Sequence, residues 1–536
     1  MAVDTKAPQA DVLGLGNEGM GSPGGYVASV IDLGFNSAKL ATYQVNGRTS
    51  YRLISQEDAK VKLGEELDET GFLAVPAMER ALRVMKMFRE IVDFESPRYV
   101  LPVATSAVRE AANRGEFLQL SEATSKFKFR VLSEQEEALL SYFGAVLSLR
   151  IPTGVFFDLG GGTLAIVYAE EYKVKKIICL PLGARRLSYL YGSPKKGGLI
   201  MKKDYERMKD HILELLPTRK ELRLAKGTKV IGVGGTVRAI ARYHLDKTRY
   251  RFEKLHNYEM SYSDVAWTTT RFAKMKRREM RSLQSMKVAR AETMAAGSAV
   301  VRLLMKSLGV SELVTSSHGL REGTLSLFLH DHRWFTARSF EQATIDRQLA
   351  SAGRAWRTAW ERHLSELFIA GIITEYEYSL LLESHEIAKK APQVADLRAR
   401  FHELMGVDSP LSHVDQLRVA IAIIVSASES FAKILVKEFS PPLKRKDTRT
   451  VTRISAVYLL LDLLEKMRAR LTIRGSAASQ GTRPLRMDIS VGGVYAEELL
   501  ARAISALRDE FKTDIDYSVV KEKGLLAMDP SDMISR

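Results

Sequence analysis

The sequence is almost without cysteine, since its 536 residues include only Cys179. This count excludes a disulfide within the chain and a thiolate metal site. Long apolar runs are also missing, because a stretch such as Val419–Val425 is far shorter than the roughly 20 residues that cross a bilayer. The first residues do not have the pattern of a secretory signal. We therefore expect a cytoplasmic protein of a reducing compartment, without membrane association.

Basic residues exceed acidic ones, with 80 Lys and Arg against 64 Asp and Glu and a formal net charge of +16. Such an excess favours polyanionic partners, among them phosphate polymers and nucleic acid. The sequence has no nucleic-acid recognition motif and no aromatic stacking platform, so specific nucleic-acid binding is not expected. The basic clusters that could extend a positive track for a polyanion are Lys195–Lys196, Lys202–Lys203, Lys274–Arg281 and Lys444–Lys446.

The pattern of residue types divides the chain into four parts. Residues 1–25 are rich in Gly, Ala and polar residues without periodicity, which predicts a disordered leader. Residues 26–145 and 146–334 alternate strand and helix patterns and predict two α/β lobes. Residues 335–536 carry long amphipathic runs and predict a mostly α-helical C-terminal domain, with a strand near "LRMDISVGG".

Two stretches share one layout: an apolar strand, Asp-Leu-Gly, a small polar turn and a second apolar strand. They are "VIDLGFNSAKLATYQV" (Val30–Val45) and "FFDLGGGTLAIVYAE" (Phe156–Glu170). Three consecutive glycines let backbone N–H groups approach a bulky anion, because no side chain stands in the way. We expect the repeat to give two duplicated lobes that face each other across a cleft. A third glycine turn, Gly232–Thr236, precedes a helix whose N-terminus also attracts anions.

The segment "VLSEQEEALLSYFGAVLSL" predicts a strand followed by a helix. Ser133 has a glutamate, Glu136, three residues later, which is the pattern of a capping box. Spacing alone favours the simpler role of Glu136 and Glu137, which is to stabilise the helix N-terminus through its dipole, and it leaves a catalytic role for Glu137 open.

These stretches resemble, in order, the motifs of the exopolyphosphatase / guanosine pentaphosphate phosphohydrolase family. The likeness covers roughly Tyr26 to Leu325 and consists of eight motifs in the family's order. They are "IDLGFNSAKL", "ATSAVREAAN", "VLSEQEEALLSYFGA", "FDLGGGT", "PLGARRLS", "GVGGTVRAIA", "ARAETMAAG" and "SHGLREG". The resemblance implies the actin–sugar kinase–Hsp70 phosphotransferase fold, with two actin-like (ribonuclease H-like) lobes facing a cleft. It also implies phosphoanhydride hydrolysis.

The resemblance further implies roles for individual residues. Glu137 matches the family's catalytic base. Asp158 matches an acid that holds magnesium, and Asp32 is its equivalent in the first lobe. Arg109 matches a phosphate-contacting arginine. The residues that resemble the family's phosphate loops are Asn36, Ser37, Gly160, Gly161, Gly162 and Thr163.

Some positions depart from the family's pattern. A glutamate usually follows the glycines of the second loop and assists at the metal, but this chain has Ala165 there. Phe35 replaces a small residue in the first loop. Lys39 stands where arginine is frequent, and lysine lacks the bidentate fork of arginine. Arg186 and Arg290 lie in matching motifs and are weaker candidates for phosphate contact.

From the resemblance we expect a Mg²⁺-dependent exopolyphosphatase, with Mn²⁺ as an alternative ion, that releases terminal orthophosphate from inorganic polyphosphate. Two alternatives remain open. One is a guanosine pentaphosphate 5′-phosphohydrolase, which the lysine at position 39 disfavours. The other is a non-catalytic sensor of polyphosphate or a nucleotide, in which the missing acid at position 165 has removed catalysis. The expected assembly is a homodimer.

Overall fold

The structure is a computed structural model. It describes residues 25–46, 50–193, 199–275, 277–281, 283, 291–337, 344–349, 359–426, 428–439, 443, 445–475 and 484–521. The expected leader, except Gly25, lies outside the described residues. So do Arg290, Lys195, Lys196 and Lys444. The chain forms two compact units that divide between Ala352 and Gly353.

The first unit contains two mixed sheets of the same design. One has the order β3-β2-β1-β4-β5, and the other has the order β12-β13-β11-β6-β7-β8. In each sheet three strands form an antiparallel meander, and the first strand of the meander also pairs in parallel with a later strand. The first sheet is built from β1 Tyr26–Leu33, β2 Ser37–Val45, β3 Tyr51–Lys60, β4 Tyr99–Ala104 and β5 Arg130–Val131. The second is built from β6 Gly154–Leu159, β7 Leu164–Glu170, β8 Lys173–Leu180, β11 Lys229–Val233, β12 Tyr258–Ser261 and β13 Glu312–Thr315. The duplication predicted from the two Asp-Leu-Gly stretches is therefore a duplication of strand order.

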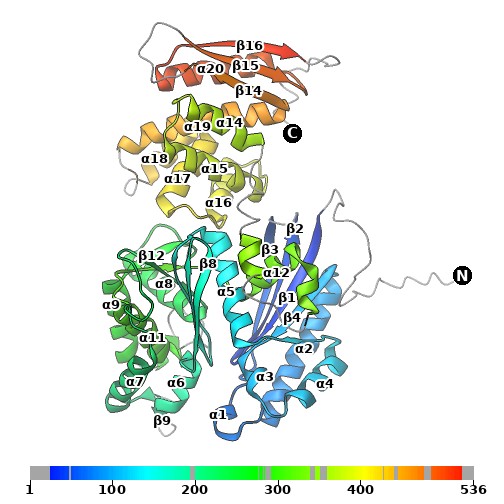
Figure 1. The fold of residues 1–536 in the computed structure, drawn as a ribbon, viewed down its shortest axis with the longest axis vertical. Coiled ribbons are helices and arrows are strands. Elements are labelled where there is room, and N and C mark those ends of the chain that lie inside the picture. The colour runs from blue at the N-terminus through cyan, green and yellow to red at the C-terminus, as the bar shows by residue number, and fades with distance from the viewer. Residues whose placement is uncertain are drawn as a thin grey trace, which may run out of the picture. The chain divides into compact units, whose positions relative to one another are not determined.

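Helices cover both sheets (Figure 1). Those near the first sheet are α1 Leu67–Thr70, α2 Val75–Glu95, α3 Ser106–Glu110, α4 Arg114–Ser125 and α5 Glu134–Leu149. Those that follow in the second lobe are α6 Ala184–Tyr191, α7 Lys202–Leu215, α8 Gly235–Thr248, α9 Tyr262–Lys274, α10 Arg277–Arg281 and α11 Met294–Ser307. α12 Leu320–His330, the short helix His332–Phe335 and a helical turn at 344–349 follow, and a small ribbon pairs β9 Gly192–Ser193 with β10 Leu199–Ile200.

Helices α5 and α12 pack against each other more closely than side chains would permit (Figure 1). A Cβ atom added to Gly323 would lie 1.9 Å from the carbonyl oxygen of Leu140, and one added to Gly144 would lie 2.3 Å from that of Gly319. Glycine is therefore required at both crossings, because a backbone atom occupies the place of the side chain. α12 also packs on β1, although it follows the second sheet in the sequence. The crossing fixes the start of α12 beside the middle of α5, at Leu140 and Gly144.

The second unit is mostly helical. Its helices are α14 Ala359–Ile369, α15 Glu375–Lys390, α16 Leu397–Gly406, α17 His413–Val425, α18 Glu429–Glu438, α19 Arg445–Lys466 and α20 Glu497–Phe511. A small sheet joins β14 Ala469–Arg474, β15 Leu485–Val491 and β16 Ile515–Lys521 in that order, and β15 is the strand expected near "LRMDISVGG". Throughout the described residues, each helix is too short or too polar to cross a membrane.

Candidate active site

The two β-hairpins of the repeat have turns with the same hydrogen bond. In the loop between β1 and β2, the N–H of Gly34 donates to the carbonyl of Ser37 at 3.0 Å. In the loop between β6 and β7, the N–H of Gly160 donates to the carbonyl of Thr163, also at 3.0 Å. The duplicated sequence therefore produces a duplicated hydrogen-bond pattern.

The second loop turns its carbonyls toward the start of α6. The carbonyls of Gly160, Gly161 and Gly162 accept hydrogen bonds from backbone N–H groups of residues 183–186. In a trans peptide the N–H points opposite to the carbonyl of the same unit. The N–H groups of Gly161, Gly162 and Thr163 therefore point away from α6. Such a row of N–H groups binds anions.

The first loop repeats this arrangement with the segment that follows β3. The carbonyl of Asn36 accepts from the N–H groups of Val61 and Lys62, at 3.1 and 3.0 Å, and the carbonyl of Phe35 accepts from the N–H of Gly64 at 3.0 Å. In both lobes, the strand after the hairpin leads into a segment whose backbone N–H groups donate hydrogen bonds to the carbonyls of the loop.

Asp158 ends β6 in a tight polar setting. One carboxylate oxygen accepts the hydroxyl of Ser141 at 2.6 Å. Gly234 lies against the other oxygen, because a Cβ at this glycine would be 2.7 Å away, and its φ of +97° also favours glycine. Burial raises the pKa of Asp158, and the carboxylate of Asp32 adds to the rise, while the Ser141 hydrogen bond opposes it. The carboxylate of Asp32 therefore lies near enough to act on Asp158.

The residues opposite the two aspartates differ between the lobes. Asp32 pairs in register with Lys39, whose ammonium lies 3.2 Å from the carboxylate. Asp158 pairs in register with Ala165, which is 8% exposed. Directly opposite residues of an antiparallel pair share one face of the sheet. A glutamate at position 165 would therefore extend on the same face as Asp158.

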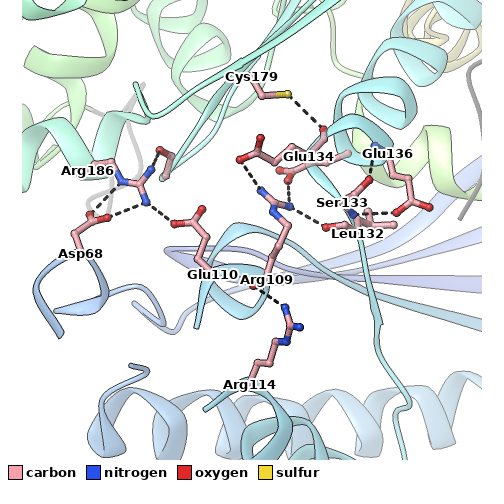
Figure 2. A network of polar contacts seen from close by, with 12 residues as sticks. Asp68, Arg109, Glu110, Arg114, Leu132, Ser133, Glu134, Glu136, Cys179 and Arg186 are labelled. Carbon is pink, nitrogen blue, oxygen red and sulfur yellow. Dashed lines mark hydrogen bonds and ion pairs between the residues drawn. The ribbon is translucent and has the colours of Figure 1, made fainter. Parts of the chain in front are cut away.

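The predicted capping box at the start of α5 is confirmed. The hydroxyl of Ser133 accepts the N–H of Glu136, and the Glu136 carboxylate accepts the N–H of Ser133 (Figure 2). Glu136 also forms an ion pair with Arg130. Because consecutive helix residues are about 100° apart around the axis, Glu137 points elsewhere than its neighbour.

The carboxyl group of Glu137 has a pKa close to neutral pH. Burial raises the pKa of its carboxyl to about 7, Asp158 and Asp32 add to the rise, and Arg109 opposes it. A guanidinium nitrogen of Arg109 donates to Glu137 and to the carbonyl of Leu132, both at 2.9 Å (Figure 2 shows the arginine beside Leu132). A carboxyl with a pKa near 7 is suited to general-base catalysis at neutral pH.

One cavity, open at its mouth, collects most of these groups. The sequence-predicted residues that line it are Asp32, Asn36, Ser37, Glu137, Asp158, Gly160, Gly161 and Thr163. Gly162 and Arg109 lie outside this lining, and so does the weaker candidate Arg186. Gly162 packs beside Phe35 and Ser106, and Arg109 contacts the site through Glu137. Both loops and the start of α5 therefore meet at a single cavity.

Sequence reasoning assigned no role to several residues that line the cavity. They are Thr105, Ser106, Arg238, Arg321 and Glu322. All of them lie within motifs that carried the family resemblance. The available signal was a charged or hydroxyl residue directly after a strand or glycine turn, at the start of a helix.

Beside the cavity, the two lobes are fastened by Arg186. Its guanidinium donates to Asp68 at 3.1 Å, to Glu110 at 2.7 Å and to the carbonyl of Gly162 at 3.0 Å (Figure 2). The same group lies 5.7 Å from the ring centre of Phe35. Asp68, Glu110 and Phe35 belong to the first lobe, whereas Arg186 and Gly162 belong to the second. Arg186 therefore connects the two lobes.

The cavity offers oxygen ligands for a hard divalent cation. The carboxylates of Asp32 and Asp158 reach it from the two lobes. The side-chain oxygen of Asn36 is buried and accepts no hydrogen bond from the described residues. Mg²⁺ is usually held by one or two carboxylates with water and phosphate oxygens, so this donor set fits it.

Comparison with known proteins agrees with this geometry. The Ppx/GppA phosphatase family matches residues 43–332. Exopolyphosphatase 2 of Mycobacterium tuberculosis is 28% identical over 311 residues, which are 55% of this chain and 96% of that protein. The bifunctional 3-dehydroquinate synthase/phosphatase of Fusobacterium nucleatum is 23% identical over 303 residues, which are 55% of this chain but only 45% of that protein.

A solved structure supports the fold. The crystal structure of an exopolyphosphatase from Cytophaga hutchinsonii matches 57% of this chain and 98% of its own, with a TM-score of 0.52 and 23% identity. The predicted fold class, two actin-like lobes followed by a mostly helical region, is confirmed. The family resemblance read from the motifs is confirmed as well. With more than half of its residues matched, the chain belongs to the Ppx/GppA phosphatase family.

Proposed function

We propose that the protein is an exopolyphosphatase, which hydrolyses the terminal phosphoanhydride of inorganic polyphosphate. The observation that carries this proposal is the meeting of two matching N–H-rich loops and Glu137 at one cavity. The charge of +16 favours a polyanionic substrate, and two of the similar proteins are named exopolyphosphatases.

In the proposed reaction, Glu137 accepts a proton from a water molecule. The water oxygen bonds to the terminal phosphorus, the bridging P–O bond breaks, and the shortened chain leaves as a phosphate anion. Charge spreads over the phosphoryl oxygens in the transition state, so fixed N–H donors around them lower the barrier. The loops that hold Gly161 and Thr163 supply such donors, and Arg109 orients the carboxylate of Glu137.

We propose Mg²⁺ as the cofactor, held by Asp32 and Asp158 with Asn36 beside them, and Mn²⁺ as an alternative. A bound divalent ion supplies positive charge next to the phosphate oxygens. The described ionisable side chains that line the cavity are four carboxylates, Asp32, Glu137, Asp158 and Glu322, and three cations, Lys39, Arg238 and Arg321. The cavity walls therefore do not carry an excess of positive charge without the ion.

Removal of divalent cations is therefore expected to weaken substrate binding as well as turnover. Affinity for polyphosphate should fall by at least about tenfold in EDTA, the equivalent of about 1.4 kcal/mol. Titration calorimetry with EDTA, and with EDTA saturated by Mg²⁺ as the control, measures this effect. An affinity that is the same in both buffers would exclude a metal in substrate binding.

Ala165→Glu is expected to strengthen metal binding, because the new carboxylate would stand opposite Asp158. The Mg²⁺ concentration for half-maximal activity should fall by roughly tenfold, within the range of effects seen for changes around a metal site. The melting temperature in EDTA should also fall, because a buried like charge is added, and Mg²⁺ should restore it. Ala165→Gln is the matched control of nearly equal shape. Equal Mg²⁺ requirements for the two variants would contradict the expectation.

Phosphate release from long-chain polyphosphate and from guanosine pentaphosphate, at matched enzyme and Mg²⁺ concentrations, tests the proposed function. The proposal expects the higher kcat/KM on polyphosphate. The reverse order would assign the chain to nucleotide hydrolysis. Binding without any phosphate release, with either Mg²⁺ or Mn²⁺, would identify a sensor.

A further inference from the structure

The guanidinium of Arg186 has partners on all three of its nitrogens, and these partners come from both lobes (Figure 2). Nε and Nη2 lie 3.1 and 2.8 Å from the two carboxylate oxygens of Asp68, and Nη2 also donates to Glu110 at 2.7 Å. Nη1 donates to the carbonyl of Gly162 at 3.0 Å. Only 9% of the side chain is exposed, so water competes little with these charge-assisted contacts.

The bond to Gly162 acts on one peptide unit of the second loop. In that unit the carbonyl of Gly162 and the N–H of Thr163 point in opposite directions, because a trans peptide is planar. The carbonyl accepts from Arg186 and also from the N–H of Gly183, at 3.1 Å, so it is held on the side of α6. The N–H of Thr163 is thereby turned away from α6, and Thr163 lines the cavity.

The loop needs such a restraint because it contains three consecutive glycines. Glycine adopts both signs of φ at little cost, so the peptide units around it rotate more readily than those of other residues. A rotated unit between Gly162 and Thr163 would present a carbonyl oxygen to a phosphate in place of an N–H, and the two negative oxygens would repel each other. Two donors on the Gly162 carbonyl oppose this rotation.

The first lobe determines where the guanidinium lies. Asp68 belongs to α1, Glu110 is the last residue of α3, and the centre of the Phe35 ring lies 5.7 Å from the guanidinium carbon. A long side chain without these partners would sample several rotamers and lose its bond to Gly162. The loop of the second lobe is therefore held in place from the first lobe.

A neighbouring arginine joins the lobes without such a bond. Arg185 donates to Glu292 at 2.9 Å, and the ammonium of Lys60, from the first lobe, lies 3.7 Å from the same carboxylate oxygen. An ion pair across the lobes thus needs no bond to a loop carbonyl. The bond from Arg186 to Gly162 has an effect on the loop that the connection of the lobes does not require.

We propose that Arg186 is a positioning residue for phosphoryl transfer, which turns the N–H of Thr163 toward the phosphate while Asp68 and Glu110 hold it from the first lobe. The proposal rests on the proposed function for the reaction that is measured. Arg186 lies outside the cavity lining, so it acts through the loop and not by contact with the substrate. Fixed N–H donors act mainly on the transition state, so their loss lowers kcat more than it raises KM.

Replacing Arg186 by glutamine is expected to lower kcat for phosphate release from polyphosphate with Mg²⁺ by about 10- to 100-fold, with KM within about threefold. Arg186→Lys keeps the charge but has no planar fork for three partners, so it should recover only part of the rate. In Arg186→Ala, free guanidinium ion should restore part of kcat at concentrations far below those that unfold proteins. Sodium chloride at the same concentration should not.

The acidic partners give a second test. Asp68→Asn and Glu110→Gln should each lower kcat, and neither should lower it further once Arg186→Gln is present, because both act through the arginine. Arg219→Gln is the matched control. Arg219, also in the second lobe, donates to the carbonyls of Gly309 and Ala225, at 3.1 and 2.6 Å, outside the cavity lining. Its kcat should stay within about twofold of the unmodified chain.

Amide hydrogen exchange gives a readout that does not need turnover. In Arg186→Gln, exchange should become faster in the loop around Gly162 and in α1, while β6 and β7 on either side of the loop keep their protection. Equally faster exchange throughout the second lobe would show a general structural role and overturn the proposal.

The outcomes separate the positioning role from the proposed function. A folded Arg186→Gln variant with unchanged kcat, whether or not KM rises, would overturn the positioning role. If this variant does not fold, Arg186→Lys, Asp68→Asn and Glu110→Gln carry the test. If the unmodified chain releases phosphate from neither polyphosphate nor guanosine pentaphosphate, the proposed function fails and hydrogen exchange alone decides the positioning role. If it releases phosphate but the variants match Arg219→Gln, the positioning role fails alone.

Discussion

Replacing Glu137 by glutamine is expected to lower kcat for phosphate release from polyphosphate by about 10²- to 10⁴-fold, the usual contribution of a general base. Glutamine preserves the size of the side chain but cannot accept the proton of the attacking water. Because the N–H-rich loops remain, substrate affinity should change much less than kcat. Stopped assays of orthophosphate release at saturating polyphosphate measure the effect.

The matched control is Glu134→Gln, on the same turn of α5. The Glu134 side chain is 51% exposed and lies 4.0 Å from Arg109. Its activity should stay within about threefold of the unmodified chain, because a screened surface charge contributes little. A kcat of Glu137→Gln close to that of Glu134→Gln would remove Glu137 from catalysis.

The pKa of Glu137 adds a pH signature to the same variant. The kcat/KM of the Mg²⁺-loaded protein should rise with pH as Glu137 ionises, because only the ionised carboxylate acts as a base, and the pKa of this carboxyl is about 7 before the ion binds. A divalent cation near Asp32 and Asp158 favours the ionised form and should move this rise to lower pH. Glu137→Gln should lose the rise altogether. A pH profile that keeps its acid limb in the variant would assign the limb to another group.

The pH dependence of folding stability has the opposite sign to that of activity. Burial raises the pKa of Glu137 from 4.5 to about 7, so the folded protein retains a proton that the unfolded chain releases between these values. The stability that this proton contributes is complete below pH 4.5 and is lost as pH rises through 7. Glu137→Gln should therefore melt at a higher temperature than the unmodified chain at pH 8, with a smaller difference at pH 5.

The largest structural effect is expected from Gly323→Ala, at the crossing of α5 and α12. The added methyl group would lie 1.9 Å from the carbonyl oxygen of Leu140 and 3.1 Å from the N of Gly144. Backbone atoms cannot turn aside as a side chain can, so the helices must separate. We expect a loss of at least about 3 kcal/mol, at the upper end for overpacking, or a failure to fold.

Gly115→Ala provides the control, because it makes the same change at a helix position with open space. Nothing lies within 4 Å of the added Cβ in α4, so a gain of up to about 1 kcal/mol is expected from helix propensity. Chemical denaturation of both variants gives the comparison. Equal stability of Gly323→Ala and Gly115→Ala would contradict the tight helix crossing.

Local patterns explain why much of this fold could be predicted. The two Asp-Leu-Gly hairpins carry their strand alternation and turn residues in the sequence, and β1–β2 and β6–β7 formed where expected. The Ser133–Glu136 capping box is equally local. Once that box takes Glu136, the helical period directs Glu137 to a different side. The family motifs supplied the role proposed for Glu137, which the period alone does not give.

What could not be predicted depends on contacts between distant parts of the chain. Tyr43 and Glu322 are 279 residues apart, yet their hydrogen bond fixes the carboxylate beside Arg321. Spacing in the sequence does not show that α12 crosses α5, or that Arg109 contacts Glu137 instead of lining the cavity. The glycines and charged residues of "SHGLREG" belong to a family motif. Only the helix crossing shows that the glycines contact α5 and that the charged residues line the cavity.

The position of Phe35 has a consequence for how this chain can diverge. Its ring occupies the space beside two glycines: a Cβ atom added to Gly64 would lie 2.3 Å from the ring, and one added to Gly162 would lie 2.9 Å from it. The aromatic residue and the two glycines therefore fit one another, and Gly162 belongs to the other lobe. A descendant that loses the ring leaves a void, and one that gains a side chain at either glycine expels the ring. Substitutions at these three sites should therefore arise together in related chains, whereas exposed neighbours drift independently.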